Sequence, residues 1–278
     1  MAGARVRLLG AAAAAARRVG ARGAARRLVA VVDRAYAARG RAPLSATIGG
    51  VRVRGYLRHR SFLAEAMRPG TTYAELFVRS LRPGMTVVDG GAHLGLYTAL
   101  AARGVGPGGL VLAFEPDRYN LAALRLNAGS APNVRIVEKA LADAPGTAIF
   151  YETPSTIGSS LLERPESRGR SVETTSVDAE LDGRDVAQLL VKLNVEGAEP
   201  RVLAGMRETL SRVGPVTIFV EVNPSLVESA GTDVDALVDG LAGDGFEVGY
   251  VELATQAVLP LPRPLPKGHL LATRQQPR

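Results

Sequence analysis

The sequence predicts an α/β protein built around one doubly wound, mostly parallel sheet of seven strands. From residue 85 onward, short runs rich in β-branched residues alternate with stretches of helical pattern, the order expected of parallel strands joined by helices. The first run, Met85–Asp89, is almost continuously apolar, as expected for a strand buried on both faces. The chain has 278 residues, of which 46% are hydrophobic, and this is enough for a sizeable core.

The expected elements follow one another along the chain. The runs with a strand pattern are Met85–Asp89, Leu110–Glu115, Val134–Leu141, Leu189–Val195, Val216–Val222, Phe246–Glu252 and, at an edge of the sheet, His269–Ala272. The stretches with a helical pattern are Gly95–Arg103, Asn120–Ala128, Glu199–Leu210 and Asp233–Ala242. Turns rich in glycine and proline separate these elements.

One segment interrupts the alternation inside the main domain, which we expect to span residues 85–278. Residues 143–178 contain two runs, Thr147–Tyr151 and Arg170–Ser176, that we expect to pair as an antiparallel hairpin. Insertions at strand ends are where substrate contacts tend to lie. The hairpin is therefore a candidate lid.

Two segments precede the main domain. Residues 42–84 are expected to form a small cap, with a hairpin near Ile48–Tyr56 and a helix near Tyr73–Ser80. Residues 1–41 form a basic arm rich in alanine and arginine, either helical or disordered, with ten arginines and one acidic residue. Such an arm can contact an anionic membrane surface or nucleic acid, but it lacks tryptophan and phenylalanine anchors. We favour the interpretation as a solvated leader.

The composition excludes several classes of protein. Cysteine is absent, which excludes disulfides, thiolate metal sites and cysteine nucleophiles. No run of 18 apolar residues predicts a membrane-spanning helix. Outside the basic arm the chain holds 24 basic and 26 acidic residues and is close to neutral. We expect a cytoplasmic protein.

A glycine-bearing turn follows the first strand and opens into a helix, which is where nucleotide-like ligands bind in doubly wound folds. The turn runs from Asp89 through Gly91 and His93 to Gly95, and it lacks the Gly-x-Gly-x-x-Gly spacing of dinucleotide sites. A carboxylate at Asp89 would repel a pyrophosphate and attract a cationic sulfonium. The turn therefore favours S-adenosylmethionine over NAD, with the glycines letting the ligand approach the backbone.

Two further carboxylates follow neighbouring strands. Glu115 ends the second strand, 26 residues after Asp89, where a carboxylate can accept hydrogen bonds from both ribose hydroxyls. Asp143 follows the third strand and is a candidate for the adenine amino group, or alternatively a turn residue. We expect the cofactor site to include both.

Six short sequence motifs occur in the same order as in a known protein family. They are Val87–Thr98, Ala113–Asp117, Ser159–Leu162, Val191–Glu199, Glu221–Pro224 and Ala230–Thr232. Together they resemble the FkbM family of methyltransferases over about residues 72–252. The resemblance implies a Rossmann-like class I methyltransferase fold and transfer of a methyl group from S-adenosylmethionine to a hydroxyl oxygen. The acceptors it implies are sugars, or polyketides and other natural-product alcohols.

The sequence departs from the family pattern at two positions. His93 stands where the family usually has Asn, and Asn194 stands where it usually has Asp before Val-Glu-Gly. The second change removes a carboxylate from the end of the fourth strand, which faces the methyl group in this architecture. A mechanism that uses that Asp as a base or a metal ligand is therefore in doubt.

Methyl transfer to an alcohol also requires removal of a proton. The candidate bases are His93, Glu196 and Glu221, of which the two glutamates follow or end the fourth and fifth strands. Asn194 can orient the hydroxyl. Glu196 has a second interpretation, as a negative charge at a helix N-terminus. We assign His93 to the methionine end of the cofactor, and Lys192 to a strand lysine that reaches the surface.

Other functions remain open at this stage. They are an NAD-dependent enzyme on the same fold, a non-catalytic protein that binds S-adenosylmethionine, and a nucleic-acid methyltransferase recruited through the basic arm. We expect a small hydroxylated acceptor rather than nucleic acid as the partner. A metal is not expected, since the chain has three widely separated histidines and no cysteine.

Overall fold

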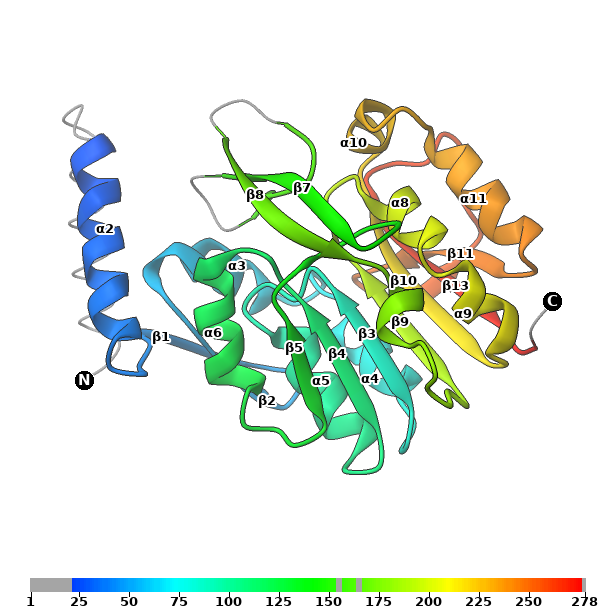
Figure 1. Ribbon diagram of the computed structural model, residues 1–278, viewed down its shortest axis with the longest axis horizontal. Helices are drawn as coiled ribbons and strands as arrows, with labels where there is room; N and C mark the ends of the chain where they lie inside the picture. The colour runs from blue at the N-terminus through cyan, green and yellow to red at the C-terminus, as the bar shows by residue number, and fades with distance from the viewer. Residues whose placement is uncertain (1–21, 154–156, 164–166, 277–278) are drawn as a thin grey trace.

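The protein is organised around one eight-stranded, mostly parallel sheet (Figure 1). The structure, a computed structural model, describes residues 22–153, 157–163 and 167–276. In spatial order the strands are β12 (Ala257–Leu259), β11 (Glu247–Glu252), β13 (Gly268–Arg274), β10 (Val216–Val222), β9 (Leu189–Leu193), β3 (Thr86–Gly90), β4 (Leu110–Phe114) and β5 (Val134–Val137). The strands from β10 to β5 run parallel, and β13 runs antiparallel to both of its neighbours.

Helices pack on both faces of this sheet. One face is covered by α7 (Val177–Glu180), α8 (Glu199–Ala204), α9 (Arg207–Arg212), α10 (Pro224–Ser229) and α11 (Val234–Gly243). The other is covered by α3 (Arg60–Ala66), α4 (Ala74–Ser80), α5 (Leu96–Val105) and the hairpin of β1 (Leu44–Ile48) and β2 (Val51–Gly55). α6 (Arg118–Ala128) packs beside β4 and β5. Because both faces are covered, every residue of β3 and β9 is buried.

The fold class predicted from the sequence is confirmed, with local corrections. The sheet has eight strands rather than seven because β12 pairs with β11, and β13 lies between β10 and β11 rather than at an edge. The predicted strand Val134–Leu141 is divided, since its second part, β6 (Ala140–Leu141), leaves the main sheet to pair with another strand. The predicted helix Glu199–Leu210 is interrupted at Gly205, where an added Cβ would lie 2.4 Å from the carbonyl oxygen of Ala142.

The insertion forms a small unit next to the carboxyl ends of the parallel strands (Figure 1), and the cap packs along α5 and α6. In the insertion, β7 (Gly146–Glu152) and β8 (Arg168–Thr175) pair as the predicted antiparallel hairpin, and β6 adds a third strand. In the cap, β1 and β2 form a hairpin that turns at Gly49 and Gly50, and the 3₁₀ turn η1 (Leu57–His59) follows it. The hairpin thus begins earlier than the predicted Ile48–Tyr56.

Part of the predicted basic arm is a helix, α2 (Arg22–Ala37), which lies at the margin of the molecule beside η1 (Figure 1). The buried Asp33 carboxylate fixes it, accepting hydrogen bonds from the backbone N–H of Leu57 at 2.8 Å and of Arg58 at 3.3 Å. The remainder of the arm, residues 1–21, lies outside the described residues. Across the described ranges, no helix is long and apolar enough to cross a bilayer.

Candidate active site

A cavity lies at the carboxyl ends of β3, β4 and β9, between the cap and the inserted hairpin. It spans about 890 Å³, including the open space at its mouth. Its wall includes Phe62, Gly91, His93, Glu115, Asn120, Ala140, Leu141, Phe150, Ile157, Ser160, Lys192, Asn194 and Glu196. The position is the one expected for ligands of open α/β sheets.

The glycines of the first turn are required by close packing. Gly91 has φ 73°, and a Cβ there would lie 2.0 Å from the carbonyl oxygen of Asn194. Gly95 has φ 91°, and a Cβ there would lie 2.8 Å from Cδ1 of Leu124. A larger residue at Gly91 would therefore displace the backbone at Asn194, whereas at Gly95 the positive φ is the stronger reason for glycine. The structure places the backbone of Gly91 on the cavity wall, but Gly95 lies behind it, against α6.

Asp89 lies beneath the cavity rather than in its wall. Its side chain has no exposed surface, and its carboxylate pairs with Lys192 Nζ at 3.0 Å and accepts a hydrogen bond from Thr98 Oγ1 at 2.6 Å. Lys192 Nζ also donates to the carbonyl oxygens of Gly90 at 3.2 Å and Gly91 at 2.8 Å. Lys192 is therefore buried, not extended to the surface as the sequence analysis expected. Its charge balances that of Asp89, so Asp89 does not present a free negative charge to a ligand.

Glu115 is the buried carboxylate that does line the cavity. It is 4% exposed and accepts hydrogen bonds from the backbone N–H of His93 at 2.7 Å and of Asp117 at 2.8 Å. Burial raises the pKa of Glu115 to about 8, and the negative charge of Asp117 adds to the shift. The end of β4 thus holds a carboxyl group close to its pKa at neutral pH. A ligand whose hydroxyl groups donate hydrogen bonds to this group would stabilise its ionised form.

His93 lies beside this carboxyl group with a strained backbone, at φ 54°. Its ring packs edge-on against Phe62 and His59, with centroids 4.8 and 5.2 Å apart. Burial holds the pKa of His93 well below its ordinary value, electrostatic interactions with His59 and Lys192 act in the same direction, and the ring is therefore neutral. Within the part of the chain that the structure describes, Nε2 is buried and has no hydrogen-bond partner.

The residues proposed for catalysis are only partly brought together. Asn194 and Glu196 follow β9 and both line the cavity, where the backbone oxygen of Glu196 accepts a hydrogen bond from Ser160 Oγ at 2.8 Å. Glu221 lies on β10 behind this wall, 3.6 Å from His269 Nε2. Burial opposes ionisation of Glu221, but the hydrogen bond from His269 and nearby positive charges lower its pKa overall.

The structure does not bring Asp143 to the cavity. Its carboxylate is about half exposed and pairs with the Arg201 guanidinium at 2.7 Å, which lowers the pKa of Asp143. The wall where the adenine contact was expected is apolar instead, formed by Ala140, Leu141 and Phe150. The interpretation of Asp143 as a surface residue near a turn is the one that fits its position.

The comparison with protein families decides the broad class. Residues 89–250, more than half of the chain, match the Methyltransferase FkbM domain family. The chain belongs to the FkbM methyltransferase family. S-adenosylmethionine is its cofactor, so the choice between the two cofactors considered from the sequence falls against NAD.

Several solved structures are similar to this FkbM methyltransferase at low identity. An rRNA methylase from Streptococcus thermophilus has 14% identity, covers 76% of this chain and 98% of its own, and gives a TM-score of 0.41. An S-adenosylmethionine-dependent O-methyltransferase from Thermotoga maritima has 16% identity, covers 81% and 68%, and gives 0.39. A precorrin-6y C5,15-methyltransferase from Geobacter metallireducens has 14% identity, covers 73% and 87%, and gives 0.40. A search of curated proteins gave no match. None of these similarities identifies the acceptor.

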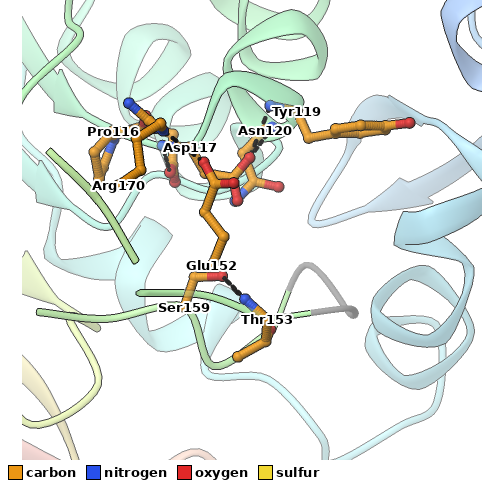
Figure 2. A network of polar contacts seen from close by, with 9 residues as sticks. Pro116, Asp117, Tyr119, Asn120, Glu152, Thr153, Ser159 and Arg170 are labelled. Atoms are coloured by element: carbon orange, nitrogen blue, oxygen red, sulfur yellow. Dashed lines mark hydrogen bonds and ion pairs between the residues drawn. The ribbon is translucent and has the colours of Figure 1, made fainter. Parts of the chain in front are cut away.

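Sequence analysis missed the contacts that tie the hairpin to the cofactor side of the FkbM domain. Arg170 Nε pairs with Glu152 at 2.8 Å, and its terminal nitrogen donates to the carbonyl oxygen of Pro116 at 2.9 Å. Figure 2 shows Arg170 and Glu152 reaching the loop of Pro116 and Asp117, while Thr153 N donates to Ser159 Oγ. No local pattern around Arg170 indicates this, because its partners are distant in sequence or on the paired strand.

Arg170→Ala should weaken binding of S-adenosylhomocysteine, the demethylated product, about 2- to 12-fold, since each lost hydrogen bond contributes about 0.5–1.5 kcal/mol. The physical reason is that the hairpin segment lining the cavity loses its tie to the loop after Glu115. Calorimetric titration measures the effect. Arg168→Ala, on the same strand but exposed, is the control and should leave the affinity unchanged. Equal affinities for the two variants would show that this tie does not shape the site.

Proposed function

We propose that this methyltransferase transfers a methyl group from S-adenosylmethionine to a hydroxyl oxygen of a small molecule, a sugar or a natural-product alcohol. The observation that carries the proposal is the enclosure of the cavity. Phe62 from the cap and Ile157–Leu161 from the insertion cover the site from two sides. Such a site favours a small acceptor over a polymer.

The cavity has two chemically different ends, which supports a position for the cofactor. At one end Glu115 would accept hydrogen bonds from the ribose hydroxyls, next to the apolar wall of Ala140, Leu141 and Phe150, which suits an adenine ring. His93, which lines the cavity, would contact the methionine end. When bound, the cofactor supplies an electrophilic methyl group on its sulfonium.

The chain's own residues at the other end would orient and deprotonate the acceptor. Asn194 would hold the acceptor hydroxyl by a hydrogen bond, and Glu196 would take its proton as the methyl group moves from sulfur to oxygen. The products are the methyl ether and S-adenosylhomocysteine. Glu221 lies behind the wall and is the second candidate for the base.

The test is a screen of hydroxylated acceptors with methyl-labelled S-adenosylmethionine, followed by variants on the best acceptor. Glu196→Gln should lower kcat about 10²- to 10⁴-fold, the usual contribution of a positioned base, without changing the affinity for S-adenosylhomocysteine. Glu228→Gln, an exposed substitution on α10, is the control. Methylation of RNA but of no small alcohol would contradict the proposal. Binding of the cofactor without turnover of any acceptor would favour a non-catalytic role.

The raised pKa of Glu115 predicts that binding is linked to proton release. Below about pH 8 the carboxyl group is mostly protonated, whereas ribose hydroxyls donate to the ionised form. Affinity for S-adenosylhomocysteine should therefore rise with pH up to about 8 and level off above it. Calorimetry at pH 7 in two buffers of different ionisation enthalpy should detect the release, and Glu115→Gln should abolish it. Uptake of protons when the wild type binds S-adenosylhomocysteine would contradict the predicted release.

A further inference from the structure

His59 lies in the cap, outside residues 89–250 that match the family, yet it contacts Asn120 and His93, two residues that line the cavity. Its side chain has no exposed surface. Nδ1 lies 3.0 Å from the backbone nitrogen of Tyr56, and Nε2 lies 3.1 Å from Oδ1 of Asn120. Both ring nitrogens are thus engaged, one by the cap and one by α6.

The contact with Tyr56 fixes the tautomer of this ring. A backbone N–H can only donate, so Nδ1 of His59 accepts and the ring proton lies on Nε2. Burial lowers the pKa of His59 to about 4, which keeps the ring neutral at pH 7. Nε2 therefore donates to Asn120, and the oxygen of the Asn120 amide must face the ring.

The orientation of Asn120 decides what faces the cavity. With its oxygen held by His59, its amino group points the other way. Asn120 is 3% exposed and lines the cavity together with Glu115. Its amide favours the ionised carboxylate of Glu115, which opposes the rise in pKa that burial causes. If the amide were turned over, its oxygen would face the Glu115 oxygens, and this would be repulsive.

We propose that His59 is a positioning residue of the cofactor site: it holds Asn120 so that the amide N–H₂ group supports Glu115, the carboxylate that would bind the ribose. The cap is then part of the cofactor site and not only a cover. The proposal concerns the nucleoside end alone and is independent of which acceptor is methylated.

A double-mutant cycle tests the proposal by the affinity for S-adenosylhomocysteine. His59→Phe keeps an aromatic ring but no hydrogen bonds, and Asn120→Leu keeps the size of the side chain but no amide. Each should weaken binding about 2- to 12-fold. Because His59 acts through Asn120, the double variant should bind no more weakly than Asn120→Leu alone. His59→Gln, whose amide can donate to Asn120, should recover part of the affinity and also serves if His59→Phe does not fold.

Controls separate positioning from a general loss of stability. Asn133→Leu removes an amide that donates to the carbonyl oxygens of Ala102 and Gly106, away from the cavity. It should lower the melting temperature without changing the affinity. Effects of His59→Phe and Asn120→Leu that multiply in the double variant would overturn the proposal. So would full affinity in a folded His59→Phe protein. Neither result depends on finding an acceptor, so failure of the hydroxyl-methylation proposal remains distinguishable.

Discussion

Replacing Lys192 with methionine is expected to destabilise the protein by about 3–5 kcal/mol, the usual result of removing one partner of a buried ion pair. Asp89 would keep only the Thr98 hydroxyl as a partner, in a site with no exposed surface. The carbonyl oxygens of Gly90 and Gly91 would also lose the hydrogen bonds from Lys192, although that of Gly90 would keep the backbone N–H of Asn194. Equilibrium unfolding in urea measures the change in the free energy of unfolding.

The exposed pair of Arg263 and Asp235, at 3.1 Å, provides the matched control, because Arg263→Met should have little measurable effect. The double variant Asp89→Asn with Lys192→Met should be more stable than Lys192→Met alone, since no unpaired charge remains buried. If Lys192→Met were no more harmful than Arg263→Met, the pair would not be the buried support described here.

The second expected result is a loss of about 10- to 150-fold in affinity for S-adenosylhomocysteine in Glu115→Gln. Hydrogen bonds to a charged group contribute about 1.5–3 kcal/mol, and the amide retains the size of the side chain but not the charge. Both carboxylate oxygens accept backbone N–H groups, from His93 and Asp117, so an amide N–H₂ must also oppose one of these donors. Calorimetric titration at pH 8.5, where the wild-type carboxylate is mostly ionised, gives the comparison.

Glu138→Gln is the control for this variant, since Glu138 is exposed, pairs with Arg125 and lies outside the cavity that holds Glu115. Its affinity should equal that of the wild type. A Glu115→Gln protein that is folded and binds as tightly as the control would remove Glu115 from the cofactor site.

The sequence pattern predicted the cavity residues that lie at the ends of strands. Glu115, Asn194 and Glu196 were expected at the carboxyl edge because each ends or follows a strand, and the cavity lies there. Asp89 also ends a strand, but its partner Lys192 lies on a neighbouring strand, 103 positions later, as its direct partner in register. The electrostatic argument from the sequence treated Asp89 as unpaired. The residues next to Asp89 and Lys192 in the sequence do not indicate that the two side chains pair across neighbouring strands.

Long-range packing explains the remaining differences in the same way. Phe62 comes from the cap and lines the cavity, and His59 lies behind the cavity wall against Asn120, only because the cap folds over α5 and the parallel strands. The position of β13 between β10 and β11 depends on strand order, which periodicity alone does not specify. The FkbM resemblance began at about residue 72 and therefore gave no signal for these cap residues.

The most direct test of the account is a crystal structure of the protein with S-adenosylhomocysteine. We predict ribose hydroxyls within hydrogen-bond distance of Glu115, an adenine ring against Leu141 and Phe150, and Asp89 still paired with Lys192 beneath the ligand. A nucleoside bound elsewhere, or one that contacts Asp89 while its ribose avoids Glu115, would contradict the account.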